Sequence, residues 1–281
     1  MKKLLIFLSL FWASATLAQQ KMSCCSPSAT ESFAQLASDP LFVMSHPLPL
    51  PFTFQSENGA PITFKAPDGS EAYGWEIKSK TPTRNYLLVV HEWWGLNDYI
   101  KQESEKLRND LGNVNVIAVD LYDRKVASTR EDAAKYVQAL TTDRAKAILQ
   151  GAIAYAGPDA RIFSIGWCFG GGWSLQASLL AGTEAGGCVM YYGMPEKDPA
   201  RLKDLHADVL AIFANKDQYI TPKLADEFSA NMEKAGKKLI LKRYDAEHGF
   251  SNPSNPIFDK AATEDAYKAV LAFLKPRIKQ A

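Results

Sequence analysis

The sequence predicts an α/β fold, a doubly wound and mostly parallel sheet with helices on both faces. From about residue 85 onward, short runs rich in Val, Ile and Leu alternate with longer segments of helical spacing. These short runs are apolar throughout, a pattern typical of strands that are buried on both faces. The chain has 281 residues, of which 47% are hydrophobic. That length is sufficient for one large core of this class.

The first residues are expected to leave the mature protein. Lys2 and Lys3 precede an apolar run over residues 4–12, and small residues lead to Ala18. This layout is typical of a secretory signal peptide over residues 1–18, and the apolar run is too short to span a bilayer as a helix. An uncleaved anchor is the alternative. We therefore expect a periplasmic or secreted protein with no membrane span in its mature form.

Residues 19–51 are expected to form an extended N-terminal arm, and residues 52–281 the folded domain. The arm is rich in Ser, Ala and Pro, with Pro47, Pro49 and Pro51 in alternation. It contains the adjacent pair Cys24-Cys25, with no ligands of metal-site spacing nearby. These thiols are expected to have no catalytic role, and His46 is expected to be solvated.

The domain divides into alternating strands and helices. A hairpin is expected at its start, because two alternating runs flank Asp68-Gly69. The expected strands are 61–65, 71–78, 86–90, 114–122, 161–165, 187–192, 209–213 and 239–244. Segments with helical spacing are 100–111, 130–156, 173–180, 222–235 and 261–274.

Charge and cysteine content narrow the function classes. The formal net charge is +1, which gives no electrostatic footprint for nucleic acid. Four cysteines are too few for a disulfide scaffold, and Cys188 lies in an apolar run where it is expected to be a buried small hydrophobe. No cofactor or metal is expected, and the sequence leaves the oligomeric state open.

The most informative stretch is Gly166-Trp167-Cys168-Phe169-Gly170. A β-rich run precedes it and a helical segment follows, which is the layout of a nucleophile elbow with Cys168 at the tip. The turn is strained and therefore needs small neighbours. Phe169 would offer its N–H at the start of a helix, where negative charge is stabilised. The alternative is a tight turn around a buried thiol.

Two further residues lie where a parallel sheet gathers its functional groups, at the carboxyl ends of strands. Asp217 follows the run 209–213, and His248 follows the run 239–244. The chain order nucleophile, acid, base is that of α/β-hydrolases. His91 also follows a strand, and Asp245 is a rival acid, so both stay open. His206 precedes a strand, so we expect it at the amino end of that strand, away from the other candidates.

Over residues 61–274 the chain resembles the dienelactone hydrolase family. The matching residues are Glu92, Gly95, Asn97, Asp120-Leu121-Tyr122, the elbow with Gly171, the Asp217 loop and His248-Gly249-Phe250. The resemblance implies that Cys168 is the nucleophile, His248 its base and Asp217 the group that orients the imidazole. It further implies an oxyanion hole from the N–H groups of Trp93 and Phe169, and substrate contacts from Trp94 and Arg130.

Two positions depart from the family pattern. Asn252 stands where the family often has a second arginine, and Ala134 replaces a tyrosine. Both changes argue against a small anionic dienelactone as the substrate. The alternative for Arg130 is a solvated arginine at the start of a helix.

The sequence thus predicts an exported hydrolase that cleaves an ester or lactone through a Cys168 acyl-thioester. A broad carboxylesterase or thioesterase is the alternative within hydrolases. A thiol–disulfide protein is a different class, but no Cys-X-X-Cys is present. A non-catalytic binding protein would have no need of all three residues Cys168, Asp217 and His248.

Glu92 has a role of its own in this interpretation. Its family counterpart contacts the resting thiol, so the resemblance implies that Glu92 keeps Cys168 neutral until substrate displaces the carboxylate. A permanent thiolate would be open to oxidation outside the cytoplasm. The alternative is a solvated surface glutamate beside two tryptophans.

Overall fold

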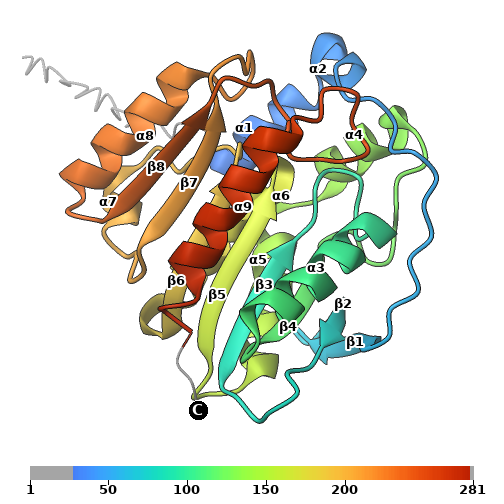
Figure 1. The fold of residues 1–281 in the computed structure, drawn as a ribbon, viewed down its shortest axis with the longest axis vertical. Coiled ribbons are helices and arrows are strands. Elements are labelled where there is room, and N and C mark those ends of the chain that lie inside the picture. The colour runs from blue at the N-terminus through green and yellow to red at the C-terminus, as the bar shows by residue number, and fades with distance from the viewer. Residues whose placement is uncertain (1–27, 279–281) are drawn as a thin grey trace, which may run out of the picture.

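The computed structural model describes residues 28–278, which form an eight-stranded sheet in the order β1-β2-β4-β3-β5-β6-β7-β8 (Figure 1). The expected signal peptide and the pair Cys24-Cys25 lie outside these residues. None of the helices within residues 28–278 is long and apolar enough to cross a membrane.

The predicted mostly parallel sheet is confirmed. Its strands are β1 Gly59–Lys65, β2 Glu71–Ile77, β3 Asn85–Val90, β4 Asn115–Asp120, β5 Arg161–Trp167, β6 Ala185–Tyr191, β7 Val209–Ala214 and β8 Leu239–Tyr244. β1 and β2 form the predicted antiparallel hairpin, and β2 also pairs antiparallel with β4. All other neighbours are parallel. The carboxyl ends of β3 and β5 to β8 therefore meet at one edge.

Helices cover both faces of the sheet, as predicted. In Figure 1, α3 Asp98–Leu111 and α9 Lys260–Leu274 lie in front, and α5 Thr142–Ala156 and α6 Phe169–Leu180 lie behind. The remaining helices of the domain are α4 Arg130–Ala139, α7 Pro199–Leu202 and α8 Pro222–Lys234, with a 3₁₀ turn at Gly182–Glu184.

Most of these helices begin with a side chain that accepts a hydrogen bond from the first turn. Asn97, Thr129, Thr141, Thr221 and Asp259 cap α3, α4, α5, α8 and α9 in this way. Helix α6 is different, because the residue at its N-cap is Cys168 and its sulfur caps nothing. That sulfur is therefore free to interact across the carboxyl edge of the sheet.

The prediction of an extended arm is wrong for residues 29–44. Ala29–Leu36 forms helix α1, which starts with a capping box between Ser28 and Glu31. Pro40–Met44 forms the short helix α2. These start signals are local, and the Ser-, Ala- and Pro-rich composition of the surrounding segment obscured them.

The N-terminal segment (residues 28–47) packs onto the domain beside α4 and α6, at the top of Figure 1. Phe33 is 2% exposed and its ring lies 5.5 Å from that of Phe169. Phe42 is fully buried and its ring contacts Trp93 and Tyr219. Burying each phenyl ring contributes about 2–3 kcal/mol. The segment is therefore anchored by aromatic side chains, directly over the carboxyl edge of the sheet.

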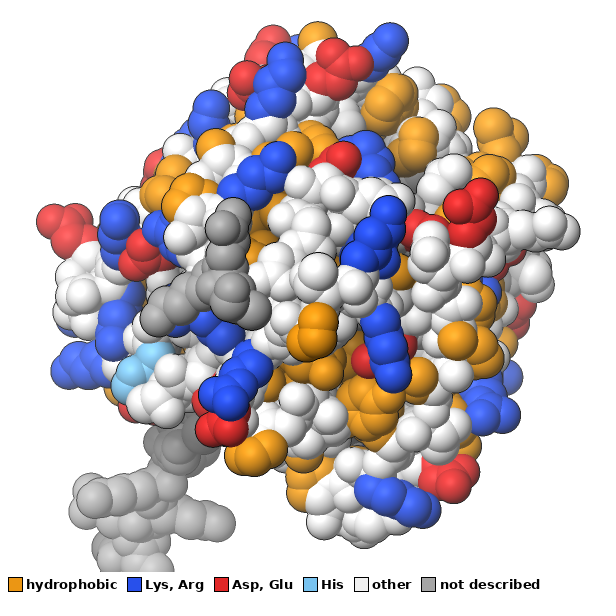
Figure 2. Space-filling model, turned by 60° about the horizontal axis from the view of Figure 1, so that its bottom comes forward, with side chains coloured by type: hydrophobic (Ala, Val, Ile, Leu, Met, Phe, Trp, Pro, Cys, Tyr) orange, Lys and Arg blue, Asp and Glu red, His pale blue; other side chains and the backbone are white. Residues whose placement is uncertain are grey.

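Surface charge on the face seen in Figure 2 is mixed. Lys and Arg side chains are interspersed with Asp and Glu side chains and with apolar ones on that face. This arrangement agrees with the formal net charge of +1. The face offers no broad single-sign field among the described residues.

Candidate active site

Cys168 sits at a strained turn between β5 and α6. Its φ of 54° lies in the left-handed region, which residues with a side chain rarely adopt. A Cβ on Gly166 would collide with the carbonyl of Gly170, and one on Gly170 would collide with the carbonyl of Val90. The two glycines therefore allow the backbone to fold tightly enough to hold the sulfur at the tip, as the elbow motif predicts.

A chain of hydrogen bonds runs from Cys168 through His248 to Asp217. His248 Nε2 lies 3.2 Å from Cys168 Sγ, and His248 Nδ1 lies 2.6 Å from Asp217 Oδ2. The other oxygen of Asp217 accepts the N–H groups of Tyr219 and Ile220 at 2.9 and 2.8 Å. The structure thus brings together the three predicted residues, from the ends of β5, β7 and β8.

The pKa shifts within this chain follow from burial and from the two neighbouring charges. Burial raises the pKa of the Cys168 thiol, against the opposing effects of His248 and the N–H of Phe169. Burial disfavours a charged imidazole, but Asp217 and Cys168 together raise the pKa of His248 well above its usual value. Burial also works against the Asp217 carboxylate, yet His248 and two backbone N–H groups hold its pKa below the usual value. Asp217 therefore stays ionised and stabilises positive charge on the His248 ring.

The rival residues do not face this site. His91 is fully buried, and its Nδ1–H donates to the carbonyl of Glu92 while its Nε2 accepts the N–H of Leu121. Both nitrogens are therefore committed to the backbone. Asp245 pairs with Lys216 at 3.0 Å on the surface. His206 is exposed.

The two tryptophans and Phe169 enclose the sulfur. Phe169 is the first residue of α6, and its N–H favours negative charge on the Cys168 sulfur. The side chain of Trp93 is fully buried and that of Trp94 is 3% exposed. Both tryptophans line a cavity of about 10 Å³ next to Cys168 and His248. That volume suits about one water molecule.

Glu92 lines the same small cavity and is half-buried, so the alternative of a freely solvated glutamate does not describe it. Burial of its carboxyl group raises its pKa to about 7, although His248 and Asn252 oppose the shift. Asn252 Nδ2 donates to Glu92 Oε2 at 2.6 Å. From the sequence, Asn252 was recognised only as a departure from the family pattern. Its position four residues after His248, where the chain returns to the site, was the signal that it faces Glu92.

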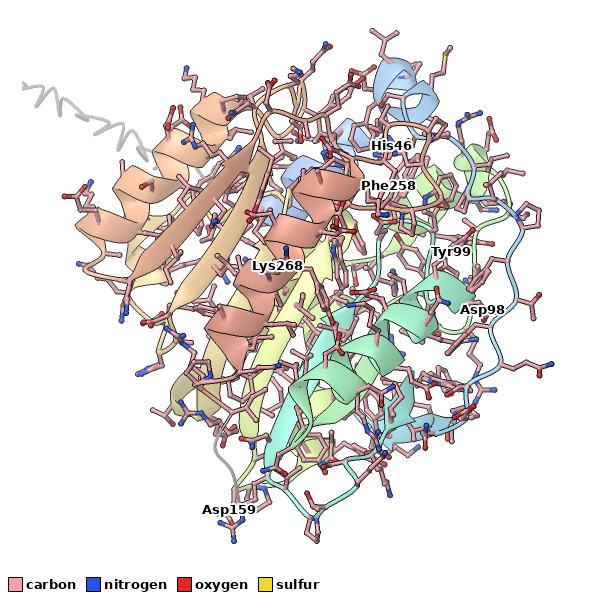
Figure 3. All side chains as sticks on the ribbon, in the orientation of Figure 1. His46, Asp98, Tyr99, Asp159, Phe258 and Lys268 are labelled. Carbon is pink, nitrogen blue, oxygen red and sulfur yellow. The ribbon has the colours of Figure 1, made fainter. Side chains whose placement is uncertain are left out.

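His46 is the functional candidate that the sequence reasoning missed. It was expected to be solvated, but it is only 8% exposed and its ring lies 4.5 Å from Trp93 and 5.3 Å from His248. Burial lowers its pKa to about 3, and the neighbouring His248 adds to the shift. Figure 3 shows His46 at the end of the molecule opposite Asp159, which precedes β5. His46 therefore lies at the carboxyl edge of the sheet. It is held there because the buried side chain of Phe42 anchors the N-terminal segment.

Arg130 holds the N-terminal segment at this edge. It is the first residue of α4, and its Nε donates to the carbonyl oxygen of His46 at 2.6 Å. The side chain is half-buried, so the alternative of a freely solvated arginine does not describe it. The Nε–H of its guanidinium is thus already engaged by the backbone of the protein.

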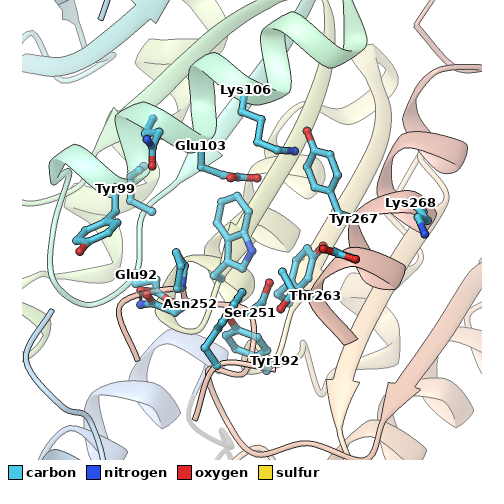
Figure 4. Close-up of a pocket in the computed structure, with 17 residues that line it drawn as sticks. Glu92, Tyr99, Glu103, Lys106, Tyr192, Ser251, Asn252, Thr263, Tyr267 and Lys268 are labelled. Carbon is cyan, nitrogen blue, oxygen red and sulfur yellow. Dashed lines mark hydrogen bonds between the residues drawn. The ribbon is translucent and has the colours of Figure 1, made fainter. Parts of the chain in front are cut away.

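A larger cavity of about 340 Å³ opens between α3 and α9 (Figure 4). Aromatic side chains form about a third of its lining, and Glu92 and Asn252 belong to the walls of both cavities. The aromatic lining residues are Tyr99, Trp167, Tyr191, Tyr192, Phe258 and Tyr267. The hydrogen bond between Glu92 and Asn252 therefore lies where the large cavity adjoins the small one.

Comparisons with known proteins agree with this geometry. The model of the dienelactone hydrolase family matches residues 73–278. Carboxymethylenebutenolidase 1 of Cupriavidus pinatubonensis is 26% identical over 215 residues, which cover 70% of this chain and 88% of that protein. Protein usf of Aquifex pyrophilus is 25% identical over 203 residues, covering 67% of this chain and 87% of its own.

Solved structures share the fold at lower identity. A dienelactone hydrolase-like promiscuous phosphotriesterase from metagenomic libraries superposes with a TM-score of 0.65 at 18% identity, covering 79% of this chain and 99% of its own. An esterase of Pyrococcus furiosus gives a TM-score of 0.60 at 14% identity, covering 83% and 98%. The predicted α/β-hydrolase fold is thereby confirmed.

Proposed function

Because the chain belongs to the dienelactone hydrolase family, we propose that this hydrolase cleaves an ester or lactone bond through a cysteinyl acyl-enzyme. The observation that carries the proposal is the continuous hydrogen-bonded chain from Cys168 through His248 to Asp217. A thiol, a base within reach of it and a group that orients the base are the three parts that nucleophilic catalysis requires.

The first half of the reaction forms a thioester. His248 Nε2 takes the proton of Cys168, and Sγ attacks the substrate carbonyl carbon. The oxyanion accepts hydrogen bonds from the N–H groups of Phe169 and Trp93, at the positive end of α6. His248 then gives its proton to the leaving alkoxide oxygen as the carbon–oxygen bond breaks. In a lactone that hydroxyl stays attached to the acyl group.

The second half releases the acid. A water molecule loses a proton to His248 Nε2 and attacks the thioester, and the proton then returns to Cys168 sulfur as the carbon–sulfur bond breaks. Asp217 keeps the Nδ1–H of the ring in place through both halves. No cofactor takes part in this sequence of steps.

The favoured substrate class is a neutral ester or lactone with an apolar acyl or alcohol group. Arg130 is engaged by the carbonyl of His46, and Asn252 by the carboxyl of Glu92. Asn252 therefore offers no guanidinium to a substrate carboxylate, and Arg130 has one of its N–H donors already engaged. The aromatic walls of the 340 Å³ cavity suit an apolar group instead. A broad carboxylesterase or thioesterase activity would use the same residues.

The proposed location is the periplasm or the extracellular space. It rests on Lys2, Lys3, the apolar run over residues 4–12 and the small residues up to Ala18. Expression of the full chain with periplasmic fractionation tests it. The mass of the recovered protein should correspond to a chain that starts after Ala18.

The activity is tested with a panel of aryl esters, thioesters and lactones. Wild type is expected to turn over members of the panel and to accumulate an acyl adduct on Cys168, seen by mass spectrometry after acid quench. Cys168→Ala should lose both. Cys188→Ala is the matched control, because Cys188 is also a buried thiol but lies inside β6 away from the cavity. Equal turnover by wild type and Cys168→Ala would refute the proposal.

A further inference from the structure

Three side chains that are good metal ligands converge at the tip of the elbow. One ring nitrogen of His46, Cys168 Sγ and one ring nitrogen of His248 all lie within 4.8 Å of one another. They come from three separate places: the end of the N-terminal segment, the turn before α6 and the loop after β8. The proposed hydrolysis uses Cys168 and His248, and it assigns no role to His46.

In both imidazoles Nδ1 is held by the protein, which leaves Nε2 as the nitrogen available to the cluster. The Nδ1–H of His46 donates to the carbonyl of Phe42 at 2.7 Å, and Nδ1 of His248 lies 2.6 Å from the carboxylate of Asp217. A carbonyl or carboxylate on the far nitrogen is the usual support of a metal-binding histidine, because it fixes the tautomer and the ring orientation.

The lone pair of His46 Nε2 is buried and unsatisfied. Among residues 28–278 it has no hydrogen-bond partner, and the side chain is only 8% exposed. Leaving a buried acceptor without a partner costs about 1–3 kcal/mol. A buried acceptor without a partner next to the candidate active site needs an explanation, and a bound cation would supply the missing partner.

The donor set fits a borderline-soft divalent ion. Zn²⁺ binds one thiolate and two imidazole nitrogens readily, with bonds of about 2.3 Å to sulfur and 2.0–2.1 Å to nitrogen. Tetrahedral angles then separate the ligand atoms by about 3.3–3.6 Å. Cys168 and His248 are already 3.2 Å apart. The His46 ring would have to move by less than about 1.5 Å to complete three ligands, leaving the fourth position to water.

We propose that His46, Cys168 and His248 form a Zn²⁺ site that closes the catalytic centre reversibly. Binding displaces the one proton that Cys168 and His248 share, so that the sulfur binds as thiolate and both Nε2 atoms bind through their lone pairs. Asp217 keeps its hydrogen bond to His248 throughout. The metal-bound protein cannot form a thioester, because Sγ and the base are both ligands. The zinc ligand set does not depend on the proposed hydrolysis, whereas the closing of the catalytic centre rests on it.

Cobalt substitution tests the ligand set without any assay of activity. The protein carries Cys24→Ser and Cys25→Ser, so that thiolate bands come only from the remaining cysteines, and is first freed of metal with a chelator. Titration with Co²⁺ is expected to give visible bands of tetrahedral intensity and a near-ultraviolet sulfur-to-cobalt band. Competition with Zn²⁺ then gives the zinc affinity.

Three variants locate the ligands. His46→Ala should weaken Zn²⁺ binding at least about tenfold, since even loss of a supporting partner costs about 10–100-fold. Cys168→Ala should lose the sulfur-to-cobalt band. His206→Ala is the matched control, because His206 is exposed at the other end of a strand and its loss should change neither value.

Folding of the variants is checked independently. Near-ultraviolet circular dichroism reports the aromatic packing of His46→Ala, and X-ray absorption of Zn²⁺-loaded wild type counts one sulfur and two imidazoles directly. An unchanged zinc affinity in His46→Ala would overturn the proposal. A zinc site with one imidazole, or with no sulfur, would overturn it as well.

Discussion

Glu92→Gln gives the sharpest test of how the thiol is controlled. The replacement keeps the size of the side chain and an oxygen that accepts from Asn252, and it removes only the charge. With a pKa of about 7, the Glu92 carboxyl is largely protonated below pH 6 and largely ionised above pH 8. An ionised Glu92 raises the pKa of Cys168 and so lowers the thiolate fraction.

The size of the effect follows from the shared cavity. Glu92 and Cys168 both line a space of about 10 Å³. Two charges about 10 Å apart repel by about 1.6 kcal/mol at an effective dielectric constant of about 20, and a shorter separation across this cavity would raise that value. One pKa unit corresponds to about 1.4 kcal/mol. The variant should accordingly hold at least about ten times more thiolate than wild type once Glu92 is ionised.

Alkylation of Cys168 by iodoacetamide measures this difference, in chelator-treated protein with Cys24 and Cys25 replaced by serine. The rate ratio of Glu92→Gln to wild type should be near one at about pH 5.5 and rise through about pH 7 to at least tenfold. Glu103→Gln is the matched control, because Glu103 also has a raised pKa but does not line the small cavity. The variant should also lose activity sooner under peroxide. A ratio that stays constant across this pH range would leave Glu92 with no gating role.

Three further predictions concern the base, the N-terminal segment and the substrate. His248→Ala should lower kcat by at least about 100-fold in protein that is still folded at the assay temperature, with a lower Tm because the buried Asp217 loses its partner. His91→Ala should also lower Tm, but each folded molecule should stay active. A folded but inactive His91→Ala protein would contradict the assignment. Phe42→Ala should cost about 3–5 kcal/mol in urea denaturation, and a loss below about 1 kcal/mol would show that the segment adds no core. Neutral aryl esters should give kcat/KM values at least as high as carboxylated lactones; a strong, Arg130-dependent preference for the lactone would argue the reverse.

The elbow and the three residues linked by hydrogen bonds could be predicted because each follows a strand. In a parallel sheet, residues far apart in the sequence share one edge whenever their strands end there, so chain order alone brings Cys168, Asp217 and His248 together. The alternatives His91 and Asp245 obeyed the same rule. Only the hydrogen-bond partners of His91 and the surface ion pair of Asp245 separate them from the site.

The place of His46 could not be predicted by the same reasoning. The N-terminal segment is not a strand of the sheet, so no rule of topology fixes where it lies. Its position depends on Phe33 and Phe42 finding aromatic partners on α6 and on the loop after β3. Such contacts depend on the shape of the folded surface, and composition says nothing about them. Asn252 was missed for a related reason, since its partner is a side chain on a distant loop.

Asn252, one of the two departures from the family pattern, and Arg130, which keeps the family residue, both have partners within the protein. Where the family often places an arginine, Asn252 stabilises the carboxyl of Glu92, and where an arginine is present, Arg130 donates to the backbone of His46. A substrate carboxylate would lack a second guanidinium and would also face the charge of Glu92 above about pH 7. A neutral substrate meets neither cost. The N-terminal segment and Asn252 therefore act in the same direction, towards selection by shape and apolar contact in the aromatic cavity between α3 and α9.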